Sequence, residues 1–183
     1  MRSTENIVEE YLVAGARLGD RKAIARLAAL RGPGLLRHAY RLLGNRDDAQ
    51  DAMQDAWIEI LKGLKGLHDD RAFPAWAYRI VTRRAARIIA ANIKRRRHAA
   101  DVAAVDDVSI AESASAAADA HAVRQAIKTL PPAQAAAISL FYLEDMSVAE
   151  VAISLDVPVG TIKTRLMHAR TKLNKALKGI PDE

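Results

Sequence analysis

The sequence predicts an all-α protein made of two small helical domains joined by a flexible linker. Apolar residues recur at three- and four-residue spacing along most of the chain, and no stretch alternates at period two for long. Alanine is abundant, whereas aromatic residues make up only 4% of the 183 residues. Between 99 and 119 the large hydrophobic residues almost disappear. We therefore expect domains at 1–98 and 120–183, separated by a linker at 99–119.

Charge and composition narrow the possible partners and the compartment. The formal net charge is +6 and the pI is near 9.8, which favours, without requiring, a polyanionic partner. The absence of cysteine excludes disulfides and thiolate zinc sites within the chain. Charged residues interrupt every apolar run before it reaches membrane-spanning length, and Glu5, Glu9 and Glu10 lie where a secretory signal would be basic and then apolar. We expect a cytoplasmic protein without membrane insertion.

We interpret the first three predicted helices as core scaffolding. The first carries the apolar residues Ile7, Val8, Tyr11, Leu12 and Leu18 and ends near Gly19. Asp20 is a suitable N-cap for the second. The sequence Gly-Pro-Gly at 32–34 predicts a turn, because glycine and proline interrupt regular helices. It is not a phosphate-binding loop, because it lacks the lysine and the spacing of that motif. A third helix then runs to Gly44.

A fourth helix is predicted over 46–64, with acidic and amide side chains gathered on its outer side. Its inner side is a broad apolar stripe of Ala49, Met53, Ala56, Trp57, Ile60, Leu61 and Leu64. Its outer side carries Asp48, Asp51, Gln54 and Asp55. Complementing the helix dipole explains acids in the first turn, but that effect fades beyond it. A binding interface explains the rest of the outer side better.

A fifth helix begins at Pro74 and is strongly cationic. Its predicted buried stripe is Ala77, Ile80, Val81, Ala85, Ile88, Ile89 and Ile93. Its basic residues are Arg79, Arg83, Arg84, Arg87, Lys94, Arg95, Arg96 and Arg97, a density that predicts a salt-sensitive surface along a nucleic-acid backbone. The preceding loop, 68–71, contains Asp69 and Arg71. Phe73 and Trp76 are of a type that can stack on unpaired bases, but core positions are favoured for both.

The linker at 99–119 carries five acidic residues and no Lys or Arg. We expect it to be mobile, because it cannot bury enough apolar area to offset its ordering entropy. A soluble spacer and a functional acidic segment are equally compatible with this composition.

The last part of the chain predicts a helix-turn-helix. Pro131 and Pro132 separate a short helix from a supporting helix with Ile138, Leu140 and Leu143 on its inner stripe. Ser147 and Glu150 form a capping box for the next helix. Asp156 ends that helix, and the final one runs from 159 to 177. Its first turns carry small, polar and basic residues, as a helix in the major groove requires, although a solvated face of an ordinary helix is the alternative.

Residues 130–173, and VPVGTIKTRL within them, resemble the C-terminal promoter-binding domain of bacterial RNA polymerase sigma factors of the extracytoplasmic-function group in the sigma-70 family. The resemblance implies that the final helix reads the −35 promoter element. The residues implied are Pro158, Gly160, Thr161, Lys163, Thr164, Arg165, His168 and Arg170.

The segment DDAQDAMQDAWIEIL at 47–61 is similar to the motif by which these factors grip the clamp helices of the largest polymerase subunit. It implies that Asp48, Asp51, Gln54 and Asp55 bind core RNA polymerase. The loop at 68–71 corresponds to one that holds a base flipped from the −10 element, and the fifth helix to the −10 reader. The residues implied are Asp69, Arg71, Arg79, Arg83, Arg84, Arg87, Lys94 and Arg95. Arg83 and Arg87 stand where relatives often have Asn and Asp, so the −10 base preference is not carried over.

The resemblance implies a transcription initiation factor that directs core RNA polymerase to promoter DNA under the control of an anti-sigma factor. No enzyme is expected, since the sequence has no paired histidines, zinc-binding motif, phosphate loop or calcium loop, and we expect no metal, cofactor or small-molecule substrate. Two alternatives remain. One is a sigma-like decoy that serves only as an interaction module, which would not need basic faces on both domains. The other is a helix-turn-helix regulator acting as a dimer, which leaves the acidic outer side of the fourth helix unexplained.

Overall fold

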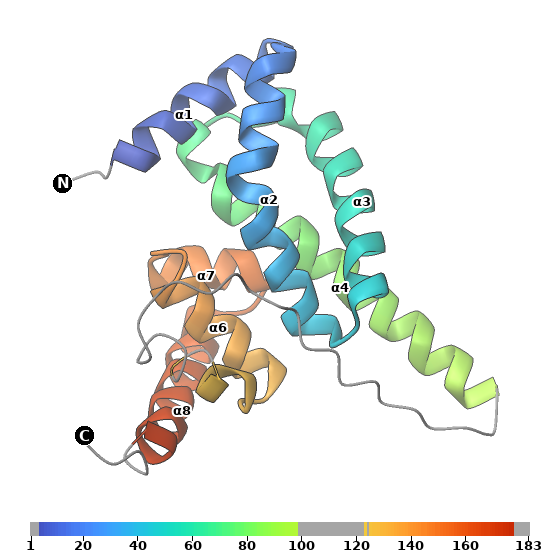
Figure 1. The fold of residues 1–183 in the computed structure, drawn as a ribbon, viewed down its shortest axis with the longest axis vertical. Helices are drawn as coiled ribbons and strands as arrows, with labels where there is room; N and C mark the ends of the chain where they lie inside the picture. The colour runs from blue at the N-terminus through green and yellow to red at the C-terminus, as the bar shows by residue number, and fades with distance from the viewer. Residues whose placement is uncertain (1–3, 99–122, 124, 178–183) are drawn as a thin grey trace. The chain divides into compact units, whose positions relative to one another are not determined.

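A computed structural model describes residues 4–98, 123 and 125–177 (Figure 1). Every regular element within these residues is helical, which confirms the all-α prediction. The chain divides into two compact units, Met1–Ala103 and Ala104–Glu183, each of which has its own core. The predicted mobile linker at 99–119 lies outside the described residues.

The first unit contains four α-helices and two short 3-10 turns. They are α1 (Thr4–Arg17), α2 (Arg21–Leu43), α3 (Arg46–Gly63), η1 (Leu64–Gly66), η2 (Asp70–Ala72) and α4 (Phe73–His98). Helices α2, α3 and α4 pack against one another, and α1 packs on α2. Leu27, Leu35, Ile60, Phe73 and Tyr78 are fully enclosed between them. The predicted N-cap of α2 is confirmed, because Asp20 accepts a hydrogen bond from the Lys22 amide at 2.8 Å.

Helix α2 is continuous through Gly-Pro-Gly at 32–34, so the predicted turn there is wrong. A proline inside a helix removes one hydrogen bond and crowds the preceding turn, at a cost of about 3 kcal/mol. Leu27 and Leu35 lie on either side of Pro33 and are both buried, 2% and 0% exposed. Burying such side chains contributes about 1.5–3 kcal/mol each, which offsets the proline. Tertiary packing therefore decides the helix here.

Helix α1 turns fewer apolar side chains inward than the sequence predicts. Ile7, Tyr11 and Leu18 are 57%, 75% and 90% exposed. Glu9 is buried instead, and its carboxylate accepts hydrogen bonds from Arg31 of α2, one of them from Nε at 2.5 Å. A partly buried, bidentate ion pair thus joins α1 to α2.

The apolar stripes of α3 and α4 are narrower than predicted. On α3, Leu61 is 44% exposed and Trp57 is half-buried. On α4, the residues from Ala77 to Ala85 in the stripe are buried as predicted, but Ile89 and Ile93 are 40% and 47% exposed. Figure 1 shows the C-terminal part of α4 running past the other helices of this unit, where those helices no longer cover it.

The second unit is helical at 125–128 and then contains α6 (Pro132–Tyr142), α7 (Val148–Leu155) and α8 (Val159–Leu177), which pack on one another. The predicted capping box is confirmed: the Ser147 amide donates to Glu150 Oε2 at 2.7 Å, and the Glu150 amide to Ser147 Oγ at 3.2 Å. Asp156 ends α7 in the left-handed conformation, with φ 55°. Leu143 was predicted to face inward, but it ends α6 and is 48% exposed.

Candidate functional site

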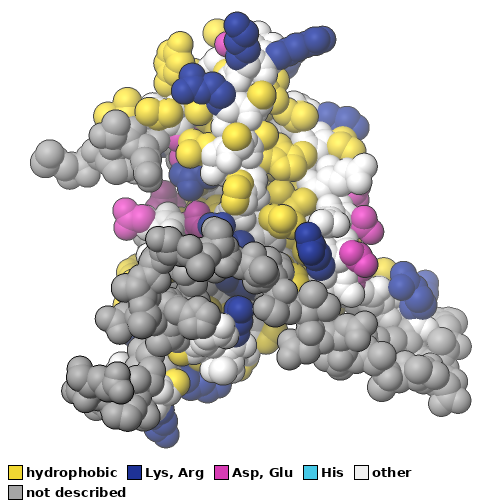
Figure 2. Space-filling view, in the orientation of Figure 1, with side chains coloured by type: hydrophobic (Ala, Val, Ile, Leu, Met, Phe, Trp, Pro, Cys, Tyr) yellow, Lys and Arg dark blue, Asp and Glu magenta, His cyan; other side chains and the backbone are white. Residues whose placement is uncertain are grey.

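The outer side of α3 is acidic and open to solvent. Asp51, Gln54 and Asp55 are exposed, whereas Asp48 is half-buried. Asn45 caps the helix, and its side-chain oxygen accepts from the Asp47 and Asp48 amides at 2.8 and 3.0 Å. Figure 2 shows acidic side chains along the outer edge of α3. Three- and four-residue spacing places the four predicted polymerase-binding residues on one helical face.

Two side chains of α4 contact this acidic face. Asn92 Nδ2 donates to Asp48 Oδ2 at 3.1 Å. Arg84 Nε donates to Glu59 Oε2 at 2.9 Å, Arg84 Nη2 donates to the same oxygen, and Arg84 Nη1 lies 3.4 Å from Asp55 Oδ2. Glu59 was not among the predicted site residues, although its position one turn after Asp55 in the same acidic motif was a usable signal. The structure thus joins the predicted polymerase-binding helix to the predicted −10 helix.

The cations of α4 divide into two groups. Arg79, Arg83, Arg87 and Lys94 follow one another at four-, four- and seven-residue intervals, so they share one side of the helix, which we call the outer row. Arg83, Arg87, Lys94 and the neighbouring Arg95 are exposed, and Arg79 is half-buried. Arg84 points toward α3 instead. The side chains of Arg96 and Arg97 lie outside the described residues.

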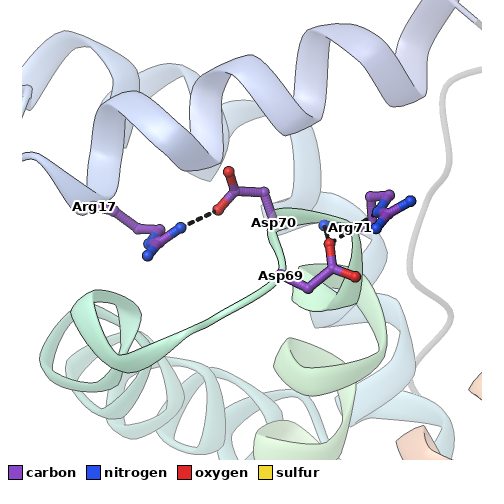
Figure 3. Close-up of polar contacts among 4 residues, drawn as sticks. All are labelled: Arg17, Asp69, Asp70 and Arg71. Atoms are coloured by element: carbon purple, nitrogen blue, oxygen red, sulfur yellow. Dashed lines mark hydrogen bonds and ion pairs between the residues drawn. The ribbon is translucent and has the colours of Figure 1, made fainter.

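The 68–71 loop has one ion pair within itself and one to α1 (Figure 3). Asp69 caps η2, and its Oδ1 accepts from the Arg71 amide at 3.0 Å and from Arg71 Nε at 2.9 Å. This hydrogen bond raises the pKa of the Arg71 guanidinium, which stays charged. In addition, Arg17 of α1 contacts Asp70. Asp69 and Arg71, both predicted to contact DNA, are exposed and pair with each other.

The two aromatic residues after this loop differ in their surroundings. Phe73 is fully buried, as the core interpretation predicts. Trp76 is half-buried and packs against the end of α3, where a Cβ atom added at Gly63 would lie 2.8 Å from Trp76 Cζ2. Gly63 therefore makes room for the indole ring.

Helix α8 presents most of its predicted DNA-contacting residues to solvent. Ile162, Leu166 and Ala169 lie on the opposite, buried side of this helix. The predicted residues Pro158, Gly160, Lys163, Thr164 and His168 are exposed, and Thr161 and Arg165 are half-buried. The Thr164 hydroxyl donates to the Gly160 carbonyl at 3.1 Å, which orients that side chain. Polar and basic groups therefore lie around the first two turns of the helix.

Arg170 differs from the rest of the predicted −35 set. Its Nε donates to the Tyr142 hydroxyl at 2.9 Å, and its guanidinium lies 5.8 and 5.6 Å from the ring centroids of Phe141 and Tyr142. This combination of hydrogen bond and cation–π contact ties α8 to α6. This packing role was not predicted from the sequence, because it depends on how the two helices meet.

His38 is enclosed between α2 and α4. Its Nε2 lies 2.9 Å from Thr82 Oγ1, whose hydroxyl donates to the Tyr78 carbonyl at 3.0 Å, so His38 Nε2 is the donor of the pair. The ring meets Tyr78 edge-on at 5.2 Å between centroids. Burial, together with the nearby charge of Arg41, lowers the pKa of His38 to about 3. His38 is therefore a neutral structural residue at physiological pH.

Two further findings concern the parts of the chain that the structure describes. They contain no cluster of three or more His, Cys, Asp or Glu side chains suited to holding a metal ion. Within them, no helix is both long enough and apolar enough to span a bilayer.

Two family profiles match the sequence, sigma-70 region 2 over residues 27–100 and sigma-70 region 4 over residues 120–173. The chain is 32% identical to the ECF RNA polymerase sigma factor SigM of Mycobacterium tuberculosis, over 91% of this chain and 83% of the relative. It is 30% identical to the RNA polymerase sigma-H factor of Pseudomonas aeruginosa, over 94% of this chain and 95% of the relative.

Two solved structures share the fold. The structure of CnrH in complex with the cytosolic domain of CnrY matches with a TM-score of 0.63 and 23% identity, over 95% of this chain and 99% of that chain. The sigma factor RpoE of Bartonella quintana, solved with the anti-sigma factor NepR, matches with a TM-score of 0.69 and 24% identity, over 86% and 98%.

Proposed function

The chain belongs to the extracytoplasmic-function group of the sigma-70 family of RNA polymerase sigma factors, and on that basis we propose which of its surfaces performs each step of initiation. It is a transcription initiation factor and not an enzyme. We assign polymerase and −10 binding to a domain at 1–98, −35 binding to a domain at 120–183, and the connection to a linker at 99–119.

The acidic face of α3 binds core RNA polymerase in this proposal. The observation that carries it is the exposure of Asp51, Gln54 and Asp55 on a helix whose opposite side is buried. An exposed acidic patch suits a basic partner surface, since complementary charge favours encounter and fixes register. A helix that served only as scaffolding would not need about two turns of exposed acidic and amide side chains.

The outer row of α4 and the 68–71 loop bind the −10 element in this proposal. Arg83, Arg87 and Lys94 present charge along one side of α4, as contact with a strand of phosphates requires. The ion pair between Asp70 and Arg17 of α1 favours one shape of the loop, so less ordering is needed when it receives a base. Capture of the extruded base would drive strand opening, with the cations holding the displaced strand.

Helix α8 reads the −35 element in this proposal. Lys163, Thr164 and Arg165 lie near its N-terminus, the part of a recognition helix that reaches base edges. Arg170 contributes by fixing α8 on α6, because its guanidinium already has protein partners.

We also propose an anti-sigma partner and action in the cytoplasm, where core polymerase and promoter DNA are found. Support for the partner comes from the similar fold of Bartonella quintana RpoE, which was solved with an anti-sigma factor.

Reconstituted transcription tests the function directly. Purified protein is added to bacterial core polymerase on a pool of promoter fragments, and initiation sites are mapped by sequencing. Discrete starts on fragments that share two spaced motifs are expected. Polymerase binding without initiation would indicate a decoy. Binding of duplex DNA as a dimer without polymerase binding would indicate an ordinary regulator.

A further inference from the structure

We propose that Arg84 and Glu59 form a positioning pair that holds the acidic face of α3 in a fixed relation to the outer row of α4. The inference rests on the proposed function, because it links the surface assigned to polymerase with the surface assigned to the −10 element. If the proposal holds, this one ion pair supports both polymerase binding and promoter opening. Arg84 then acts by positioning α3 and does not contact DNA.

The geometry of the pair favours a lasting contact. Arg84 Nε donates to Glu59 Oε2 at 2.9 Å, and Nη2 donates to the same oxygen. The Arg84 side chain is 26% exposed and that of Glu59 is 39% exposed. Partial shielding reduces screening by salt, and a guanidinium with two donors on one carboxylate is held more firmly than a lysine would be.

The same guanidinium also orders the neighbouring carboxylate. Asp55 and Glu59 are one helical turn apart, so their like charges repel. Arg84 Nη1 lies 3.4 Å from Asp55 Oδ2, which offsets that repulsion with a weaker contact. Asp55 remains 61% exposed, so it can meet a basic partner surface while Arg84 keeps Glu59 in place.

Arg84 is poorly placed to contact DNA. Two of its three donor nitrogens point at Glu59, and the third lies near Asp55. The outer row is centred roughly 90° round α4 from Arg84, with Arg87, three residues on, at its nearer edge. Contact with a phosphate would require Arg84 to leave both carboxylates.

A second hydrogen bond joins α4 to the first turn of α3. Asn92 Nδ2 donates to Asp48 Oδ2 at 3.1 Å. Two of the four residues assigned to polymerase binding, Asp48 and Asp55, are therefore each bonded to α4. Helices α3 and α4 behave as one body, so a shift of one surface moves the other.

The test uses the full-length protein and four variants: Glu59→Gln, Arg84→Gln, the charge swap Glu59→Arg with Arg84→Glu, and Arg83→Gln from the outer row. Core-polymerase affinity is measured by titration, and strand opening by permanganate reactivity at saturating polymerase. Each of the first two variants should weaken polymerase binding by about three- to tenfold and reduce opening. The charge swap should recover most of both losses, and Arg83→Gln should reduce opening while polymerase affinity stays at the wild-type value.

Three results would overturn the inference. If the charge swap recovers polymerase affinity but not opening, Arg84 contacts DNA. If it recovers neither while helix content is intact, Glu59 meets polymerase itself. If the single substitutions match wild type, the pair has no positioning role. Arg84→Lys, which keeps the charge but not the geometry, should be intermediate and provides a milder variant should Arg84→Gln unfold. Failure of the wild-type protein to bind polymerase would instead refute the proposed function.

Discussion

Arg17 Nη1 lies 2.8 Å from Asp70 Oδ1, joining the last residue of α1 to η2 across 53 positions of sequence. The side chains of Arg17 and Asp70 are 32% and 26% exposed, so the ion pair is only partly open to solvent. It ties the 68–71 loop to α1, whereas the Asp69–Arg71 pair lies within the loop itself (Figure 3). The loop that we propose receives a −10 base is therefore shaped by contacts with a distant helix.

Arg17→Met should impair promoter opening more than it impairs folding. Losing a half-exposed ion pair costs about 0.5–1 kcal/mol of unfolding free energy. Opening should fall further than this cost suggests, because the loop must then be ordered when the base binds. Permanganate reactivity and urea unfolding would measure the two effects. Arg21→Met, at an exposed cation on the next helix, is the control, and wild-type opening in Arg17→Met would show that the ion pair does not shape the loop.

Asp51→Arg with Asp55→Arg should abolish binding to core polymerase while helix content is kept. Both side chains are exposed, so the substitutions reverse the charge of the acidic face without entering the core. Titration of core polymerase and circular dichroism would check the two outcomes. Ala25→Arg, at an exposed position of α2, is the control for added charge. Unchanged polymerase affinity in the double variant would remove the assignment of this face.

Arg165→Ala should weaken binding of the −35 element by roughly 1–3 kcal/mol if its guanidinium reads a base. Competition between promoters that differ at single −35 positions would show whether the loss is specific to one base pair. A loss that is uniform across sequences, with a smaller salt dependence, would mean that Arg165 meets phosphate alone. Lys172→Ala, an exposed cation further along α8, serves as the control.

Acid should destabilise the first unit through His38. The pKa of His38 is about 3 in the folded protein, whereas a histidine in the unfolded chain has the usual pKa of 6.5. Between these two pH values the unfolded chain therefore binds more protons than the folded one. Stability that is complete above pH 6.5 is therefore lost as the pH falls toward 3, by up to about 1.4 kcal/mol per pH unit. Both tryptophans, Trp57 and Trp76, lie in this unit, so their fluorescence during urea unfolding reports on it.

His38→Gln separates this effect from the titration of carboxylates, which both proteins share. Its unfolding free energy should fall less steeply between pH 6.5 and 4 than that of the wild-type protein. Equal slopes for the two proteins would show that His38 does not carry the pH dependence.

Pro33→Ala should stabilise the first unit by up to about 3 kcal/mol, since it restores a backbone donor and removes a steric conflict within α2. Pro33 is exposed, so the change leaves the core intact. Thermal unfolding followed by tryptophan fluorescence would test it. A loss of stability would mean that a bend at Pro33 is needed to place Leu27 and Leu35 together in the core.

Much of the fold follows from local signals. The capping box at Ser147, the left-handed end at Asp156 and the bounds of α8 were predicted correctly, because caps and periodicity act within a few residues. The acidic face of α3 and the cationic character of α4 were also visible as patterns. Predictions that required knowledge of neighbouring helices were less accurate, as the exposure of Leu61, Ile89 and Leu143 shows.

The sequence by itself determined the helical class, the helix-turn-helix and the family, since each rests on periodicity, caps or a contiguous motif. The tertiary structure alone decided that α2 continues through Pro33, that Arg84 pairs with Glu59, that Arg170 packs on Phe141 and Tyr142, and that Arg17 holds Asp70. The physical reason is that each of these depends on packing between distant parts of the chain. The three side-chain pairs join residues 25 to 53 positions apart, which folding brings within a few ångströms of each other. Periodicity shows which side of a helix is buried, but it does not show which side chain lies across from it.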